Sequence, residues 1–245
     1  MRPPSAERAT ERAPAVRAAA TGAVVTLAGT VLSGPVSLAL VRLHPQPPWS
    51  GPEAFARAYH PIQSLPYFTG FLLVGGALYM IAALQALARE PLRARATAAL
   101  GFAAAFAALI FFNYVVQTTF VPALVQGGSP DDRPLVAALA LSNPRALGWA
   151  IEMWGYAVLG VATWLIAPVL ADYGRSGRVA AALFVANGPV SIVGAVWTAL
   201  QPGWVMTPPG LALFALWNLL VIAMVTLAIA AFRTNVRNAT ALSSI

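Results

Sequence analysis

Six apolar runs, each of about 20 residues or more, divide this 245-residue chain into alternating hydrophobic and polar segments. A helix of about 20 apolar residues crosses roughly 30 Å of hydrocarbon at about 1.5 Å per residue. The runs therefore predict an all-α, polytopic integral membrane protein with six transmembrane helices. The expected spans are residues 18–41, 64–88, 96–125, 147–171, 179–200 and 211–232.

The composition supports a membrane protein. Hydrophobic residues make up 59% of the chain and charged residues only 9%, whereas soluble domains carry about 25% charged residues. The chain has no cysteine, which excludes disulfides, thiol nucleophiles and cysteine metal sites. All 15 basic residues are Arg, a bias typical of GC-rich coding. We therefore expect a bacterial protein of the cytoplasmic (cell inner) membrane.

Polar segments flank the predicted bundle of residues 18–232. Residues 1–17 are rich in Arg, Glu, Pro and Ala, and we expect a disordered cytoplasmic tail there. Residues 233–245 form the expected C-terminal cytoplasmic tail. The first apolar run is longer than the core of about 7–15 residues in a signal peptide, which predicts an uncleaved helix. Gly34-Pro35 predicts a kink within it, because proline removes a helical hydrogen bond.

The Arg residues predict the orientation. Eleven of the 15 lie in the two tails and in the links 89–95 and 172–178, and the other four lie in the three opposite loops. By the positive-inside rule, both termini are cytoplasmic. Within the outer loop 126–146, the apolar segment Leu135–Leu141 is too short to span and predicts an interfacial or re-entrant helical turn.

The formal charge of +7 is explained by Arg residues that meet lipid head groups. No basic face with interleaved aromatics suggests a nucleic-acid partner. His44 and His60 lie in a proline-rich loop without metal-ligand spacing, so we expect no metal. Phosphate-binding loops, His-Glu-x-x-His and Gly-x-Ser-x-Gly are absent, and we expect no cofactor. Gly75-Gly76 fits close helix packing better than a phosphate cradle.

Glu152 is the only acidic or basic residue well inside an apolar run. A carboxylate in hydrocarbon is expensive and marks a candidate functional site. It lies roughly 7–8 Å below the outer end of its helix, at about 1.5 Å per residue. The spans contain no Lys, Arg or His to pair with it, so we expect a neutral or water-linked carboxyl. A structural hydrogen bond, a proton relay and a general acid are all compatible with this position.

Further polar and aromatic side chains accompany Glu152. Trp149, Tyr156, Gly160 and Thr163 share its helical face because they recur at intervals of three and four. Other spans carry Asn113, Gln117, Asn187 and Asn218, and Gln117 and Asn218 fall in the same outer half of the bilayer. Such amides also act as glue between helices, at about 0.6 kcal/mol each. The candidate ligand-binding residues are Trp149, Glu152, Tyr156, Asn113, Gln117, Asn187 and Asn218.

The segment Gly34-Pro35-Val36-Ser37 recurs as Gly188-Pro189-Val190-Ser191. Further along the chain, in the loop after its span, each copy is followed by Gln-Pro-x-Trp. Gly/Pro breaks at matching positions often mark transporter sites. Chance in a proline-rich chain is the alternative.

Three functions remain open from the sequence. The first is binding or moving a small, mostly apolar ligand in an outward-facing intramembrane pocket around Glu152. The second is a membrane-embedded enzyme acting on a lipid or isoprenoid-like substrate, with Glu152 as the catalytic general acid. The third is an accessory subunit that binds another membrane protein or a second copy of itself. Membrane lipids are expected partners in each case. A cavity that reaches Glu152 favours the first two functions, and a closed core favours the third.

Overall fold

The structure is a computed structural model that describes residues 6–242, and the side chains of residues 12–235. Within that part, every regular element is a helix. Six helical stretches of 24 to 38 residues are long and apolar enough to cross a membrane. The predicted all-α, six-span membrane fold is confirmed.

The first three spans are interrupted or extended by short elements. The first joins α1 (Ala6–Val31), the π-helical turn η1 (Leu32–Val36) and α2 (Ser37–Val41). The second joins the 3₁₀ turn η2 (Pro61–Ser64) to α4 (Leu65–Leu87). The third contains η3 (Glu90–Leu92), α5 (Arg93–Val115), the π-helical turn η4 (Val116–Phe120) and α6 (Val121–Gly127). The last three spans are single helices, namely α8 (Leu147–Leu170), α9 (Gly174–Leu200) and α10 (Pro208–Leu242).

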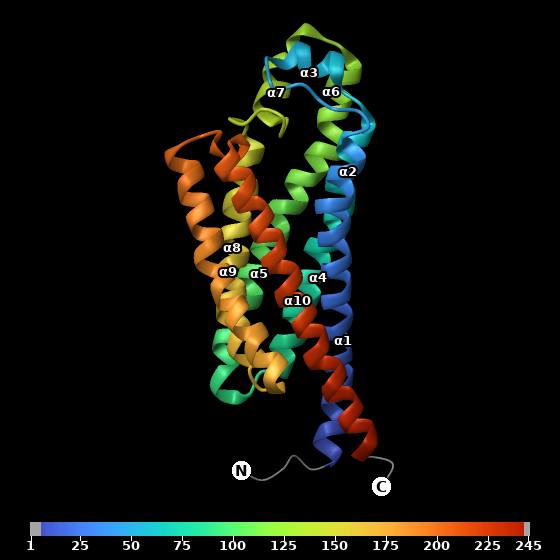
Figure 1. Cartoon of the computed structure of the whole chain (residues 1–245), viewed down its shortest axis with the longest axis vertical. Coiled ribbons are helices and arrows are strands. Elements are labelled where there is room, and N and C mark those ends of the chain that lie inside the picture. The colour runs from blue at the N-terminus through green and yellow to red at the C-terminus, as the bar shows by residue number, and fades with distance from the viewer. Residues whose placement is uncertain (1–5, 243–245) are drawn as a thin grey trace.

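Short helices cover one end of the bundle, and the beginning of α1 and the end of α10 lie at the other (Figure 1). We call these the capped end and the terminal end. The capped end carries α3 (Pro52–Ala58), α6, η5 (Pro130–Asp132) and α7 (Arg133–Leu139), together with η6 (Trp204–Met206). Helix α7 is the short helical turn expected between residues 126 and 146. The assignment of the terminal end to the cytoplasm stays a prediction from the Arg residues.

The N-terminal segment differs from the expectation. We expected disorder over residues 1–17, but α1 already begins at Ala6; residues 1–5 lie outside the described residues. Ala, Glu and Arg are strong helix formers, and the segment is held against the bundle in two places. Val16 is buried in the core, and Arg12 Nη2 donates a 2.6 Å hydrogen bond to the carbonyl of Leu87. The polar residues of this segment therefore form the first turns of a helix rather than a disordered tail.

The irregularity predicted at Gly34-Pro35 takes the form of the π-helical turn η1. The hydroxyl of Ser37 donates to the carbonyl of Leu32 at 2.6 Å and so provides a partner for a backbone group within this turn. The second π-helical turn, η4, precedes Pro122 and was not predicted. The second Gly-Pro-Val-Ser copy lies in the continuous α-helix α9, so the two copies differ in backbone conformation.

Glycines allow two helix pairs to pack closely. A Cβ atom built on Gly22 would lie 2.5 Å from the backbone nitrogen of Met80, and one on Gly76 would lie 2.5 Å from that of Thr26. Helices α1 and α4 therefore touch through their backbones, as we expected for Gly76. Gly160 of α8 meets Gly188 of α9 in a similar way, where a Cβ would lie 3.1 Å from the Gly188 carbonyl oxygen.

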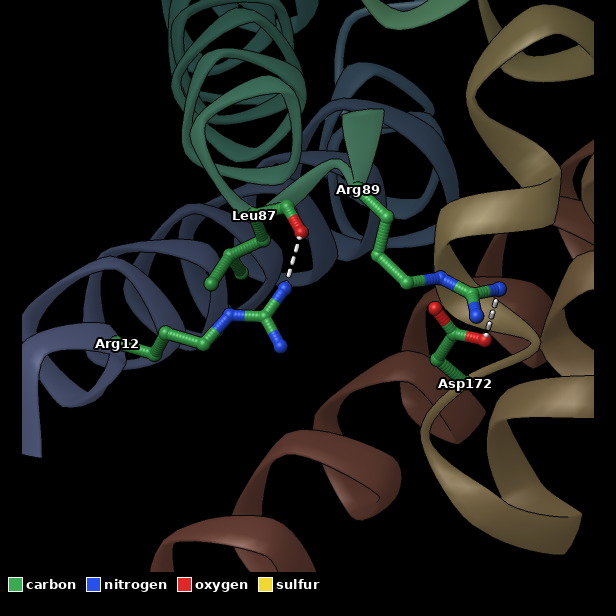
Figure 2. A network of polar contacts seen from close by, with 4 residues as sticks. All are labelled: Arg12, Leu87, Arg89 and Asp172. Atoms are coloured by element: carbon green, nitrogen blue, oxygen red, sulfur yellow. Dashed lines mark hydrogen bonds and ion pairs between the residues drawn. The ribbon is translucent and has the colours of Figure 1, made fainter. Parts of the chain in front are cut away.

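Polar contacts join three segments at the terminal end (Figure 2). Arg12 reaches the last turn of α4 through the Leu87 carbonyl, and Arg89 Nη2 pairs with Asp172 Oδ1 at 2.9 Å. The second contact connects the α4–α5 link to the α8–α9 link. These Arg residues therefore brace the ends of the helices as well as supplying positive charge.

Candidate functional site

A cavity of about 300 Å³ lies toward the capped end of the bundle. Its wall is built by α4, α5, α8, α9, η6 and α10, with Ser33 and Gly34 of η1 on one side. Leu211 and Phe214 of α10 belong to this wall and are each 54% exposed. The cavity therefore extends from the middle of the helices to the lipid-facing surface of α10.

Glu152 lies on this wall, where α8 is partly exposed to the cavity. Both carboxyl oxygens accept hydrogen bonds from α5. Asn113 Nδ2 donates to Oε2 at 2.7 Å, and the Tyr114 hydroxyl donates to Oε1 at 3.2 Å. Asn113 Nδ2 also donates to the Gly148 carbonyl at 3.2 Å. Because a carbonyl only accepts, this second contact fixes the amide with its nitrogen toward Glu152.

Tyr156 extends this arrangement by one more hydroxyl. The Tyr114 and Tyr156 hydroxyls are 3.1 Å apart. Because Tyr114 donates its only proton to Glu152, Tyr156 is the donor between the two tyrosines. Glu152, Tyr114 and Tyr156 thus form a directed chain of hydrogen bonds along the cavity wall, which we call the Glu–Tyr chain. The Tyr156 ring is held by aromatic contacts with Trp217 at 4.8 Å and with Phe106 at 5.3 Å between centroids.

Three tryptophans contribute to the cavity wall, and each has its indole N–H occupied by a protein acceptor. Trp149 donates to the Leu141 carbonyl at 2.7 Å, and Trp204 donates to the Thr198 hydroxyl at 2.7 Å. Trp217 donates to Asn187 Oδ1 at 3.0 Å. These side chains therefore offer the cavity their ring carbons rather than their donors.

Four of the predicted residues line the cavity: Trp149, Glu152, Tyr156 and Asn218. The Asn218 amide donates to the Phe214 carbonyl of its own helix at 2.9 Å. Its Oδ1 atom approaches η1, since a Cβ built on Gly34 would lie 2.8 Å from it. Asn113 is fully buried behind Glu152 and acts on the cavity through that carboxyl.

The other two predicted residues lie away from the cavity. Gln117 Nε2 donates to the Leu139 carbonyl at 2.9 Å, and its Oε1 accepts from the Leu141 backbone N–H at 3.1 Å. Gln117 thus anchors the end of α7 and the segment that follows it, and it does not join Glu152 and Asn218 on the cavity wall. Asn187 joins three helices, because it donates to Thr163 of α8 at 3.1 Å and accepts from Trp217 of α10.

Sequence reasoning missed Tyr114, Tyr67, Trp204 and Trp217, which all line the cavity. Tyr114 and Trp217 lie deep within apolar spans, where an interfacial belt does not account for them. A buried tyrosine hydroxyl or indole N–H needs a hydrogen-bond partner. Tyr114 and Trp217 are next to Asn113 and Asn218 in the sequence. Their depth within the spans was the sequence signal that could have placed them at the site.

Glu152 provides the one carboxyl group among the described residues of the cavity wall. Within the described side chains, no Arg or His lines it. Arg145, the cation closest to Glu152 in sequence, is exposed at the capped end. Both Gly-Pro-Val-Ser segments border the same cavity, through Gly34 on one side and Val190 and Ser191 on the other.

Comparisons with models of protein families, with curated proteins and with solved structures show no significant match to the chain.

Proposed function

We propose that the protein binds a small, mostly apolar ligand in the cavity, with Glu152 as the polar anchor. One observation carries the proposal: a carboxyl group held by two fixed donors within a transmembrane bundle borders a cavity of about 300 Å³. Ligand pockets measure about 300–1,000 Å³ and combine apolar walls with a few well-placed polar groups. The Glu–Tyr chain is such a polar group in a wall that is mostly aromatic and aliphatic, with Ser33, Ser191 and Asn218 as its other polar side chains.

The cavity also favours this function over that of an accessory subunit. A carboxyl that serves only to join helices needs no open space beside it, because lipid-embedded polar groups are stabilised by contact with neighbouring helices. Here Glu152 contacts Asn113 and Tyr114 on one side and borders the cavity on the other. This second side is available to a ligand.

We place the entry of the ligand on the lateral, membrane-facing side of the cavity. At the capped end, Trp204 and Val205 of η6 are buried and line the cavity with Leu141, although Met206 of the same turn is 45% exposed. On the lateral side, exposed Leu211 and Phe214 of α10 border the cavity. In keeping with the Arg distribution, we place the cavity in the outer half of a bacterial cytoplasmic membrane.

Binding of an apolar fluorescent probe tests the proposal. The protein is placed in phosphatidylcholine nanodiscs and titrated with N-phenyl-1-naphthylamine, an uncharged probe that brightens in apolar sites. Gly194→Leu fills the cavity, because a Cβ at Gly194 meets only the flexible end of Met153, at 3.0 Å. Gly101→Leu is the matched control, since a Cβ there has no atom within 4 Å.

We expect saturable binding of about one probe per chain in the wild type. Gly194→Leu weakens it about tenfold or more, whereas Gly101→Leu leaves it within about threefold. Probe signal that rises without saturation, or that is equal in the wild type and Gly194→Leu, contradicts the proposal.

A further inference from the structure

We infer that the ligand of this cavity carries a positive charge and is a lipophilic amine or quaternary ammonium compound. This inference rests on the proposed function and narrows the class of ligand. It follows from what the cavity offers and from what it lacks.

The first argument is the charge of the wall. Glu152 is its one acidic side chain, and none of the described lining residues is a cation. An opposite charge beside a carboxylate stabilises it far more in a low-dielectric site than in water. Because the protein provides no such partner around the cavity, a cationic ligand is the component that completes the pair.

The second argument is the direction of the hydrogen bonds. Asn113 and Tyr114 both donate to Glu152, and Tyr156 donates to Tyr114. Burial without a cation disfavours the ionised carboxyl, whereas donors that converge on it favour that form, so a bound cation completes the conditions for a carboxylate. Each oxygen keeps a further lone pair for a ligand. The Glu–Tyr chain is thus arranged as an acceptor site.

The third argument is the aromatic wall. Tyr67, Trp149, Tyr156, Trp204 and Trp217 all border the cavity. A cation near an aromatic face gains about 0.5–1 kcal/mol at exposed sites and about 2 kcal/mol when desolvated, and aromatic cages are the usual recognition element for quaternary ammonium groups. Rings beside one carboxylate therefore match an ammonium head with an apolar tail.

The fourth argument concerns the donors on the wall. The three tryptophan N–H groups are used by protein acceptors and the Asn218 amide donates to Phe214, which leaves the neutral hydroxyls of Tyr67 and Ser33 as the donors for an anionic ligand. Asn218 Oδ1 adds a further acceptor on the η1 side. The polar groups that face the cavity thus favour a cation or a donor over an anion.

Two competitors that differ only in charge test the inference. Octyltrimethylammonium and 2,2-dimethyldecane have the same heavy-atom skeleton, with nitrogen or carbon at the branched centre. Each competitor is used to displace N-phenyl-1-naphthylamine from the protein in phosphatidylcholine nanodiscs. Its affinity is expressed relative to its amount per mole of lipid, so that a difference between the two competitors in partition into the membrane does not affect the comparison. The variant is Glu152→Gln. The matched control is Glu90→Gln, which removes an exposed carboxylate at the terminal end.

We expect the wild type and Glu90→Gln to prefer octyltrimethylammonium about tenfold or more, and Glu152→Gln to lower this preference to about threefold or less. If the probe binds but the wild type shows no preference, the ligand class is wrong and the proposed cavity function stands. If the preference persists in a folded Glu152→Gln protein, Glu152 is not the anchor and the inference fails. If the wild type binds no probe, the proposed function fails and this inference with it.

Should Glu152→Gln not fold, the wild-type comparison still decides the charge of the ligand. Trp217→Leu, which removes one ring, is then expected to lower the preference for octyltrimethylammonium about threefold.

Discussion

Asn113 and Glu152 join α5 to α8 through a 2.7 Å hydrogen bond from Nδ2 to Oε2, and the same nitrogen donates to the carbonyl of Gly148 one turn earlier on α8. One buried amide thus orients the carboxyl and fixes the spacing of the two helices. The cavity begins on the far side of this contact.

The first prediction concerns that contact. Asn113→Ala removes a donor from both Glu152 and the Gly148 carbonyl, so we expect the free energy of unfolding to fall by about 1–3 kcal/mol. Residues in one hydrogen-bond network show coupling energies of about 0.5–3 kcal/mol. The double variant with Glu152→Gln should therefore lose less stability than the two single variants together. Denaturant unfolding in detergent measures these values, and Gln85→Ala, which removes an amide at the terminal end, is the control. Additive effects would contradict a direct Asn113–Glu152 contact in the folded protein.

The second prediction concerns the middle of the Glu–Tyr chain. Tyr114→Phe keeps the buried ring but removes the hydroxyl that links Tyr156 to Glu152. We expect a loss of about 0.5–1.5 kcal/mol in unfolding free energy and weaker binding of an ammonium ligand. Tyr79→Phe is the control, because Tyr79 is half-exposed on the surface of α4. If Tyr114→Phe and Tyr79→Phe behave alike in both assays, the chain has no part in binding.

The third prediction concerns the approach of α1 to α4. A Cβ on Gly29 would collide with the backbone of Leu73. Backbone atoms cannot move aside as the end of a flexible side chain can. We expect Gly29→Ala to separate the helices and to cost about 1–3 kcal/mol, the usual range for overpacking. Gly101→Ala meets no atom within 4 Å and, because Ala is the better helix former, should be neutral or slightly stabilising. Equal thermal stability of the two variants would show that α1 and α4 are further apart than described.

The fourth prediction concerns orientation. The chain has no cysteine, so single cysteines can be introduced without background labelling. Asp131→Cys lies in η5 at the capped end, and Glu90→Cys lies in the α4–α5 link at the terminal end. If the terminal end is cytoplasmic, a membrane-impermeant maleimide labels Asp131→Cys in intact cells and labels Glu90→Cys only after lysis. The reverse pattern would contradict the orientation taken from the Arg residues.

The six spans followed from the sequence because lipid imposes a simple requirement. Each crossing must be an apolar helix of about 20 residues, and the observed stretches include the predicted ones to within a residue or two. The largest differences lie outside the apolar runs, as in α1, which begins at Ala6, and α10, which continues to Leu242. The polar residues at these two ends belong to the same helices as the apolar runs, and a prediction from hydropathy does not include them.

The site was predictable along one helix and less so between helices. Trp149, Glu152 and Tyr156 line the cavity together because spacing along α8 fixes their common face. Asn113 and Gln117 are four residues apart, a spacing that predicts a common face on a regular α-helix. However, the π-helical turn η4 begins at Val116 and changes the register between them. Asn113 therefore meets Glu152, whereas Gln117 meets the segment after α7. The rotation of each helix about its axis depends on packing across the bundle, as the unpredicted contact of Tyr114 with Glu152 illustrates.

Covalent labelling from within the membrane is the most direct test of the cavity as a ligand site. A diazirine-bearing, uncharged octyl probe is photolysed with the protein in nanodiscs, and the modified residues are mapped by peptide mass spectrometry. The account predicts saturable labelling of Met153 and Trp217 in the cavity wall, competed by N-phenyl-1-naphthylamine and lost in Gly194→Leu. Labelling confined to lipid-facing residues such as Leu216 and Leu219, unaffected by competitor or by Gly194→Leu, would contradict it.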